Sequence, residues 1–334
     1  MIYRLYVKSA NTDLIYESEM ELKSFFEKNR LSIEFPGLFF SDDNIFESNY
    51  KVVYKNTNNR KIEFDENTCS IEYPISEINQ SSIAYMGYVL LEKQRAEQHS
   101  LTAHCACVDY NGNGVLILGK EGSGKTTTAI NLCKSFNASL VANDLSIIDY
   151  TDQQNIKVLD GTKFLFLRKE SIKRNLPELL EKFGEDKIDS WLNKVKVMPA
   201  DVGIKTATGT NLKRAFIVHV DNEQKQLHVT SGDTMVNKLY LNEIFQKYIR
   251  NTCTTFLNKD YNPIGFVPSF DCPKFYKERV GLINCILDDM KLEYVSGNVG
   301  DVSEYIDTQM CEFKIIGDKS GQKTPVVEEG EYEK

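Results

Sequence analysis

This sequence of 334 residues lacks the patterns that identify membrane, secreted and nucleic-acid-binding proteins. It has no apolar run near the ~20 residues that a membrane-spanning helix requires, and residues 1–8 are too short and too charged for a signal peptide. No basic stretch with interleaved aromatic residues occurs, and the net charge of -8 argues against nucleic acid as the main partner. We therefore expect a cytoplasmic protein without a membrane or nucleic-acid partner.

Cysteine motifs are also missing, because the eight cysteines are scattered and no C-x-x-C occurs. Cys105 and Cys107 alternate along a predicted strand, and with His104 they could contribute to a zinc site. Zinc would need further ligands at plausible spacing, and none is evident. Reduced, mostly buried thiols are the better interpretation, because free cysteine tends to lie in protein cores.

The composition that is present, 41 % hydrophobic and 26 % charged residues, is typical of a globular protein with one large or two modest domains. Residues 1–95 predict a small β-rich N-terminal module, because short runs with β-branched and aromatic residues are separated by polar turns. These predicted strands span residues 2–7, 50–54, 61–64 and 70–73. The module carries no chemical motif, so it either shapes a substrate site or covers one edge of the next domain.

The pattern then changes to that of an α/β domain. Residues 83–98 predict an amphipathic helix, and residues 101–109 predict a strand that contains His104. Residues 111–114, Asn-Gly-Asn-Gly, predict a hairpin turn. His104 is therefore expected on the strand next to the apolar strand at 115–118.

A glycine-rich loop follows that apolar strand and precedes a predicted helix. Its sequence fits G-x-x-x-x-G-K-[ST], the phosphate-binding loop, or P-loop, and strand, loop and helix occur in the order that this motif requires. The predicted nucleotide-binding residues are Gly119, Lys120, Glu121, Gly122, Ser123, Gly124, Lys125, Thr126 and Thr127. The sequence G-x-G-x-x-G is absent, so a dinucleotide-binding fold is not supported.

The residue types in this loop suit a nucleotide. Glycines let successive backbone N–H groups gather around an anion, at the positive end of the helix dipole. Lys125 can reach the β- and γ-phosphates, and Thr126 can place its hydroxyl on Mg²⁺. ATP and Mg²⁺ are therefore the expected cofactors.

A second apolar strand, residues 138–142, is followed by Asn143 and Asp144. An acid at such a strand end binds Mg²⁺ in P-loop proteins, directly or through water. Asp144 is thus the predicted metal ligand beside Thr126. The alternative is a turn or helix-capping aspartate.

Three stretches, residues 101–104, 114–126 and 140–144, together resemble the core of the HPr kinase/phosphorylase family. Relatives of that family include kinases of small ribosomal peptides such as lasso peptides, and phosphoenolpyruvate carboxykinase shares the nucleotide core more remotely. The resemblance implies an α/β fold with a P-loop nucleotide-binding core of this type over residues 96–316. It implies that His104, Lys125 and Asp144 are catalytic. It also leaves a homo-oligomer open, because such relatives often oligomerise.

The activity that the resemblance implies is ATP-dependent transfer of the γ-phosphate to a hydroxyl, with a serine of a peptide or protein as the expected acceptor. Two alternatives stay open: a nucleotide-binding regulator without phosphotransfer, and a kinase of a small hydroxyl substrate. A regulator would bind nucleotide through the same loop.

One position departs from the family pattern. The family has a paired Asp-Asp whose first acid takes the proton from the attacking hydroxyl, and this chain has Asn143 there. An amide cannot act as a base. Three interpretations remain: His104 or Asp144 is the base, transfer depends on positioning and metal electrostatics, or the protein binds nucleotide without transferring phosphate.

The rest of the chain offers weaker signals. Cations that could contact the γ-phosphate are Lys163, Arg168, Lys205 and Arg214, with Lys163 and Arg168 favoured because they follow Asp144 soonest. Helices are predicted at residues 171–183, 185–195, 237–251 and 273–288, with the start of a short one at 302–306, and strands at 215–220 and 291–295. The polar, acidic tail at 317–334 is predicted to be disordered.

Overall fold

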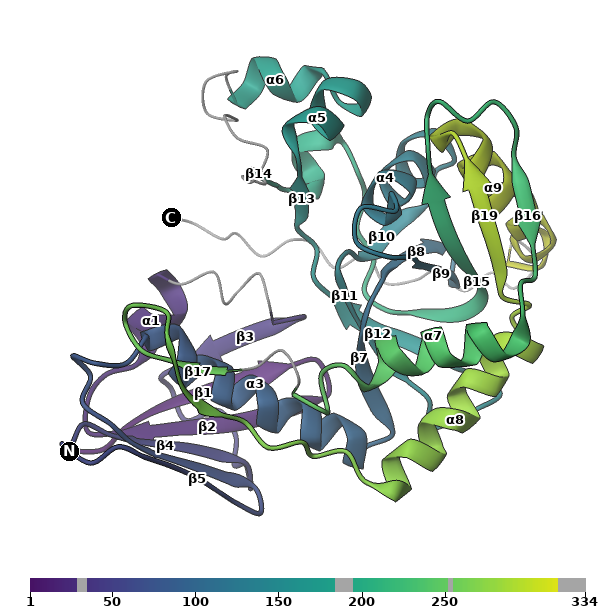
Figure 1. Cartoon of the computed structure of the whole chain (residues 1–334). Helices are drawn as coiled ribbons and strands as arrows, with labels where there is room; N and C mark the ends of the chain where they lie inside the picture. Colours follow the sequence, from purple (N-terminus) through teal and green to yellow (C-terminus); the bar gives the residue numbers. More distant parts are fainter. Residues whose placement is uncertain (29–34, 184–194, 252–254, 318–334) are drawn as a thin grey trace.

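The computed structural model describes residues 1–28, 35–183, 195–251 and 255–317. Over these ranges the chain is a mixed α/β structure whose strands form a six-stranded sheet, a nine-stranded sheet and two two-stranded pairs. The six-stranded N-terminal sheet and the nine-stranded central sheet lie on opposite sides of the molecule (Figure 1). No helix in the described ranges is both long and apolar enough to cross a membrane.

The N-terminal sheet has the strand order β3-β1-β2-β4-β6-β5. Its strands are β1 (Tyr3–Ser9), β2 (Thr12–Ser18), β3 (Leu38–Ser41), β4 (Lys51–Lys55), β5 (Lys61–Asp65) and β6 (Thr68–Glu72), and a short helix α1 (Lys23–Lys28) follows β2. Four of these strands are the predicted ones. The sequence did not indicate β2, because most of its residues are buried and the alternation of apolar and polar positions is lost.

Helix α3 (Gln80–Glu97) joins the two sheets (Figure 1). The Asn79 side chain caps its N-terminus by accepting a hydrogen bond from the Ser81 N–H. The predicted amphipathic pattern is wrong, because buried residues run along the helix on all sides. One side packs on the N-terminal sheet, where Tyr16 donates to the Ala84 carbonyl, and the other side packs toward the central sheet.

A hairpin from far downstream completes the core of the N-terminal sheet. It consists of β17 (Thr255–Leu257) and β18 (Pro263–Phe266). Phe256 is fully buried, and its ring lies 5.7 Å from the ring of Tyr73. The Asn79 N–H donates to the Leu257 carbonyl, which attaches the hairpin to the start of α3.

The central sheet has the order β10-β8-β9-β15-β12-β11-β7, with β19 beside β15 and β16 beside β19. Its strands are β7 (Ser100–His104), β8 (Ala106–Tyr110), β9 (Asn113–Leu118), β10 (Ser139–Ala142), β11 (Leu145–Asp149), β12 (Lys157–Gly161), β15 (Thr210–Val220), β16 (His228–Thr230) and β19 (Glu293–Gly297). Pairing of β9 with β15 and of β15 with β19 is parallel. The carboxyl ends of these three strands therefore lie at one edge of the sheet.

The single strand predicted at residues 101–109 is wrong. The strand is interrupted at Cys105, so that β7 pairs with β11 while β8 pairs with β9 and β10. The prediction that His104 lies on the strand next to β9 is therefore also wrong, because His104 ends β7. The Ser146 hydroxyl donates to the Cys105 carbonyl at this break. The predicted hairpin turn is confirmed: Asn111 and Gly112 both have positive φ, which suits the two-residue turn between β8 and β9.

Helices cover both faces of the central sheet (Figure 1). One face carries α4 (Lys125–Ser135), α5 (Lys169–Asn175), α6 (Glu178–Phe183) and α9 (Val299–Gly317), and the other carries α7 (Thr234–Gln246) and α8 (Pro273–Asp288). A short antiparallel pair of β13 (Leu165–Leu167) and β14 (Val195–Val197) lies beside α5 and α6 (Figure 1), and the 3-10 helix η2 (Pro199–Val202) follows β14.

The helix predicted at 273–288 is confirmed, whereas α9 is much longer than predicted. Residues 184–194, which include most of the helix predicted at 185–195, lie outside the described residues. Residues 318–334 of the tail predicted to be disordered at 317–334 also lie outside them, and Gly317 ends α9. The cysteines of the described ranges are free, and Cys69, Cys105, Cys107 and Cys133 are buried, as expected for core thiols. Burial raises the pKa of Cys105 to about 12.

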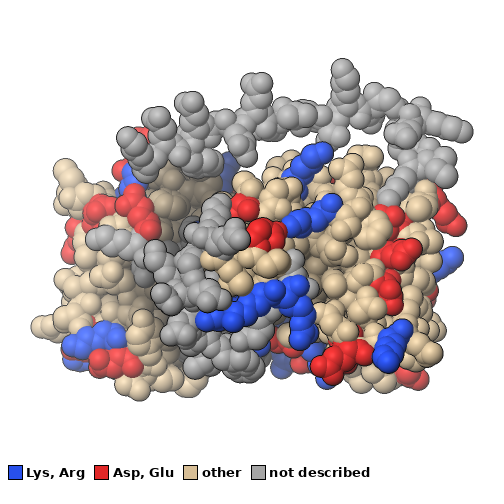
Figure 2. Space-filling view, turned by 90° about the horizontal axis from the view of Figure 1, so that it is seen from above, with Lys and Arg blue, Asp and Glu red and all other residues tan. Residues whose placement is uncertain are grey.

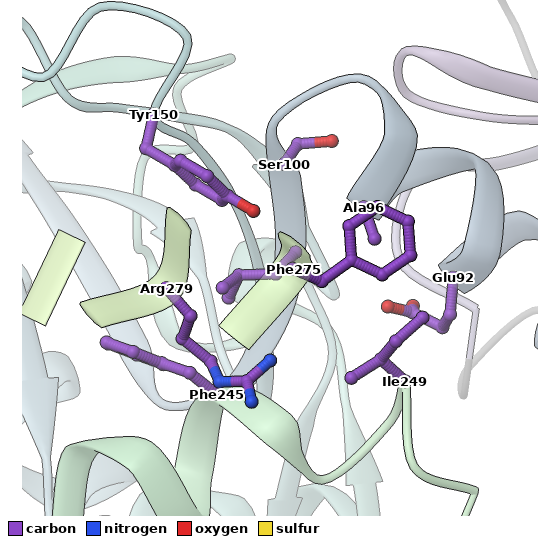
Figure 3. A pocket seen from close by; sticks show the side chains of 9 residues that line it. Glu92, Ala96, Ser100, Tyr150, Phe245, Ile249, Phe275 and Arg279 are labelled. Atoms are coloured by element: carbon purple, nitrogen blue, oxygen red, sulfur yellow. The ribbon is translucent and has the colours of Figure 1, made fainter. Parts of the chain in front are cut away.

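A buried ion pair lies where α3 meets both sheets. The side chains of Arg95 and Glu92 are almost fully buried, with Nη1 2.5 Å from Oε1. Arg95 also donates to the Ser9 carbonyl in β1, and the Thr102 hydroxyl in β7 donates to Glu92 Oε1 at 2.6 Å. A cavity of about 10 Å³, enough for one water molecule, adjoins Glu92. Glu92 and Arg279 line it from different helices (Figure 3).

Removing one partner of this pair should be costly. We expect Arg95→Met to lower the free energy of unfolding by about 3–5 kcal/mol, because Glu92 would stay buried without its counter-ion. The matched control is Arg4→Met, which removes an ion pair to Glu17 from a half-exposed arginine and should cost about 1 kcal/mol or less. Urea unfolding of both variants measures the difference. Equal losses of unfolding free energy in the two variants would show that the buried pair stabilises the fold no more than the exposed pair does.

Candidate functional site

The glycine-rich loop lies between the end of β9 and the start of α4, at the carboxyl edge of the parallel strands. Gly119, Gly122 and Gly124 all have positive φ, at 149°, 79° and 92°, a region that other residues rarely adopt. The Val220 N–H, at the end of β15, donates to the Ser123 carbonyl over 2.8 Å. The loop is thus attached to the neighbouring parallel strand.

Two of these glycines also lack room for a side chain. A Cβ at Gly124 would lie 2.5 Å from the Val220 Cβ, and a Cβ at Gly119 would lie 2.8 Å from the Val218 carbonyl oxygen. Both distances are shorter than any Cβ tolerates. The loop therefore needs glycine for its backbone conformation and for its close packing against β15.

The helix start and its lysine face the inside of the loop. Gly124 is the N-cap of α4 and provides no side-chain capping bond, and the first turn has no acidic residue. The positive end of the helix dipole is therefore not neutralised by the helix itself. Lys125 is 7 % exposed, and its Nζ donates to the carbonyls of Gly119 (2.8 Å) and Lys120 (3.1 Å).

The residue after the lysine contacts the position at which the sequence departs from the family pattern. Thr126 Oγ1 donates to Asn143 Oδ1 over 2.8 Å, and Asn143 Nδ2 donates to the Phe164 carbonyl over 2.9 Å. Asn143 is fully buried. Its backbone N–H donates to the Thr162 carbonyl, and the Thr162 hydroxyl donates back to the Asn143 carbonyl.

His104 and Asp144 lie close together at the same site. His104 ends β7 opposite Leu145, the first residue of β11, and its Nε2 is 3.7 Å from Asp144 Oδ1. Their side chains are 33 % and 40 % exposed, so both can meet a ligand from solvent. Asp144 has a φ of 68°, which an aspartate adopts more readily than most residues. The turn from β10 to β11 thus presents the carboxylate beside the imidazole.

The four candidate cations have different surroundings in the structure. Arg168 is at the N-terminus of α5, with Nη2 3.4 Å from Oε1 of Glu121 in the loop. Lys163 instead donates to the Val141 and Ala207 carbonyls and pairs with Asp160, which holds it against the backbone. Arg214 pairs with Glu293 away from the loop, and Lys205 is exposed. Arg168 is therefore the cation of this set that contacts the loop.

Sequence reasoning missed the contribution of the segment between β12 and β13. Phe164 holds Asn143 through its carbonyl, and Lys196 Nζ lies 3.9 Å from the centre of the Phe164 ring. Burial lowers the pKa of Lys196. No spacing could indicate these contacts, because one uses a main-chain oxygen and the other crosses from β14 to the segment preceding β13.

The oxygen atoms at this site are of the type that Mg²⁺ prefers, namely the Thr126 hydroxyl and the Asp144 carboxylate. The described ranges contain no group of three or more His, Cys, Asp or Glu residues that could hold a metal unaided. A cation here would therefore need additional oxygens, such as those of phosphates. The face of the molecule seen in Figure 2 carries basic and acidic side chains side by side rather than a surface of one sign.

Comparison with known proteins indicates a distant relation of fold. No family model matches the chain, and a search of curated proteins found no match either. Among solved structures, the chain is similar to the Hpr(Ser) kinase/phosphatase from Coxiella burnetii, with a TM-score of 0.28 and 9 % identity, over 65 % of this chain and 98 % of that chain. Similarity at this level indicates only a distant relation of fold.

The packing of the loop can be tested by adding a methyl group. Gly124→Ala should lower the free energy of unfolding by about 2–5 kcal/mol, because it combines backbone strain with a collision against Val220. Gly112→Ala is the control, since its φ is also positive and its Cβ would meet open space, so it should cost about 1–2 kcal/mol.

The test is completed in a second background. In Val220→Gly, which removes the colliding Cβ as well as the two methyl groups, the added cost of Gly124→Ala should fall to that of Gly112→Ala, as measured by thermal or urea unfolding. If the cost of Gly124→Ala does not depend on residue 220, the close packing of the loop on β15 is incorrect.

Proposed function

We propose that the chain is an ATP-dependent phosphotransferase that acts on a hydroxyl group. The observation that carries this proposal is the arrangement of two elements at one edge of the central sheet: the glycine loop with Lys125 and Thr126, and the His104–Asp144 pair. The first has the chemistry of a triphosphate site, and the second has the chemistry of a proton acceptor. The distant relation to an Hpr(Ser) kinase/phosphatase is compatible with a kinase-like role.

In this proposal the loop N–H groups and the N-terminus of α4 bind the β- and γ-phosphates. Lys125 exchanges its carbonyl partners, Gly119 and Lys120, for phosphate oxygens. Thr126 and Asp144 hold Mg²⁺, which supplies charge stabilisation to the transferring phosphoryl group. Arg168 is close enough to the loop to add a further positive charge, once it separates from Glu121.

The acceptor hydroxyl would approach beside His104 and Asp144. Its oxygen forms the new bond to the γ-phosphorus while the bond from that phosphorus to the β,γ-bridging oxygen breaks, and the hydroxyl proton passes to the pair. We propose a serine of a peptide or protein as the acceptor, in keeping with the family that the sequence resembles. Residues 96–316 would form the catalytic part, and the N-terminal module would border the acceptor site.

Nucleotide binding without transfer is the second candidate function. It is favoured by Asn143, which is fully buried at the place where the family has its base. A kinase of a small hydroxyl compound would use the same residues. The two candidate activities and the regulator differ in where label from ATP appears.

The decisive experiment uses γ-labelled ATP, Mg²⁺ and an extract of the host cell. We expect label in a protein or peptide fraction with the unaltered protein, and loss of both ATP binding and transfer in Lys125→Ala. Lys134→Ala is the control, because Lys134 lies on the same helix and only pairs with Glu178 at the surface. His104→Ala should lower the transfer rate by about 10²–10⁴-fold while leaving ATP binding largely intact. Asp144→Asn should lower the transfer rate and also weaken ATP binding in Mg²⁺, because Asp144 is a proposed metal ligand.

Other outcomes separate the alternatives. Tight ATP binding without transfer identifies a nucleotide-binding regulator. Label in a small-molecule fraction identifies a small-molecule kinase. Absence of ATP binding by the unaltered protein contradicts all three.

A further inference from the structure

Asn143 has a fixed orientation between two partners. Its Oδ1 accepts from Thr126 and its Nδ2 donates to the Phe164 carbonyl. A carbonyl oxygen can only accept a hydrogen bond, so the NH₂ group of the amide has to face Phe164 and the oxygen has to face Thr126. Because the Asn143 side chain is fully buried, water does not reach its amide group.

This orientation determines where the single proton of the Thr126 hydroxyl points. A hydroxyl has one proton and two lone pairs. The proton is committed to Asn143 Oδ1, since that oxygen has no proton to offer in return. The lone pairs are therefore directed away from Asn143 and remain free to ligate a cation.

We propose that Asn143 is a positioning residue, which orients the Thr126 hydroxyl as a ligand for the Mg²⁺ that accompanies the nucleotide. The proposal rests on the function proposed above. It replaces the interpretation of Asn143 as a catalytic base that has been lost. In this structure the residue acts on the metal side of the site, through Thr126, while His104 and Asp144 form the pair at which an acceptor would lose its proton.

The surroundings explain why an amide stands here rather than an acid. A carboxylate at residue 143 would still accept from Thr126, but it would have no proton for the Phe164 carbonyl. Two oxygens would then face each other at about the 2.9 Å that now separates Asn143 Nδ2 from the Phe164 carbonyl, and a carboxylate would be buried at residue 143. The main-chain position of Phe164 therefore favours asparagine.

The same amide links the loop to a segment that carries a second loop contact. Phe164 precedes β13, and β13 leads to Arg168, which contacts Glu121 across the loop. The Lys196 ammonium lies on the Phe164 ring from the opposite strand. Loss of the amide would release Phe164, so the effects of changing Asn143 have to be separated into those on Thr126 and those on this segment.

A double-mutant cycle makes that separation. The affinity for the non-hydrolysable analogue AMP-PNP is measured by calorimetry, with Mg²⁺ and with EDTA, for the unaltered protein, Asn143→Leu, Thr126→Val and the double variant. We expect Asn143→Leu to reduce affinity by about 10–100-fold in Mg²⁺, a loss typical of residues that orient metal ligands. Affinity in EDTA should change by about twofold or less, a difference too small for a disrupted loop.

The cycle then shows whether Asn143 acts through Thr126. In the Thr126→Val background, Asn143→Leu should cause no additional loss in Mg²⁺. Thr126→Ser, which keeps the hydroxyl, is the matched control and should retain the full response to Asn143→Leu. Equal losses in Mg²⁺ and EDTA, or an unchanged loss in the Thr126→Val background, would overturn the proposal.

A second variant keeps the test meaningful if Asn143→Leu does not fold. Asn143→Asp should lower the melting temperature and should not raise the transfer rate. A rise of tenfold or more would restore the interpretation of a lost base and overturn the positioning role. Failure of the unaltered protein to bind the analogue would remove the proposed function and this role together, whereas intact binding without the Mg²⁺ coupling would remove this role alone.

Discussion

The glycine loop is held to the central sheet by the hydrogen bond from the Val220 N–H to the Ser123 carbonyl, and most of the site is placed by that attachment. It joins the ends of two parallel strands, β9 and β15, whose side chains form one core with α4 and α9. The direction of α4, and with it the positions of Lys125 and Thr126, follows from this packing rather than from a capping side chain. The packing at the carboxyl ends of β9 and β15 thus positions the residues that would contact phosphate.

The second half of the site depends on pairing between distant parts of the chain. His104 and Asp144 are 40 positions apart in sequence, and the antiparallel pairing of β7 with β11 brings them together. The break at Cys105 allows the same stretch of chain to end beside Asp144 and to continue, as β8, beside β9. One bend therefore connects a candidate proton acceptor with β8, the strand beside β9, and β9 leads into the loop.

Turns and helices that depend on neighbouring residues could be predicted from the sequence. Contacts between residues far apart in the chain could not. The Asn111–Gly112 turn and α8 follow from patterns within a few residues, and both are present in the structure. The break at Cys105 was missed because the apolar run continues through it, and its cause lies in strands that come later in the chain. The loop glycines Gly119, Gly122 and Gly124 have positive φ, a conformation that glycine adopts readily. The contact of Asn143 with Phe164 uses a main-chain oxygen, which has no counterpart in a residue pattern.

The composition of the core beneath the N-terminal sheet limits how this protein can evolve by recombination. Its strands come from the first part of the sequence, but Phe256 and Val267, buried in the same core, come from the segment between α7 and α8. A recombination event that exchanged only the N-terminal residues would leave this downstream segment facing a foreign surface. The two parts are therefore expected to be inherited together, and sequence changes around Tyr73 should be accompanied by compensating changes around Phe256.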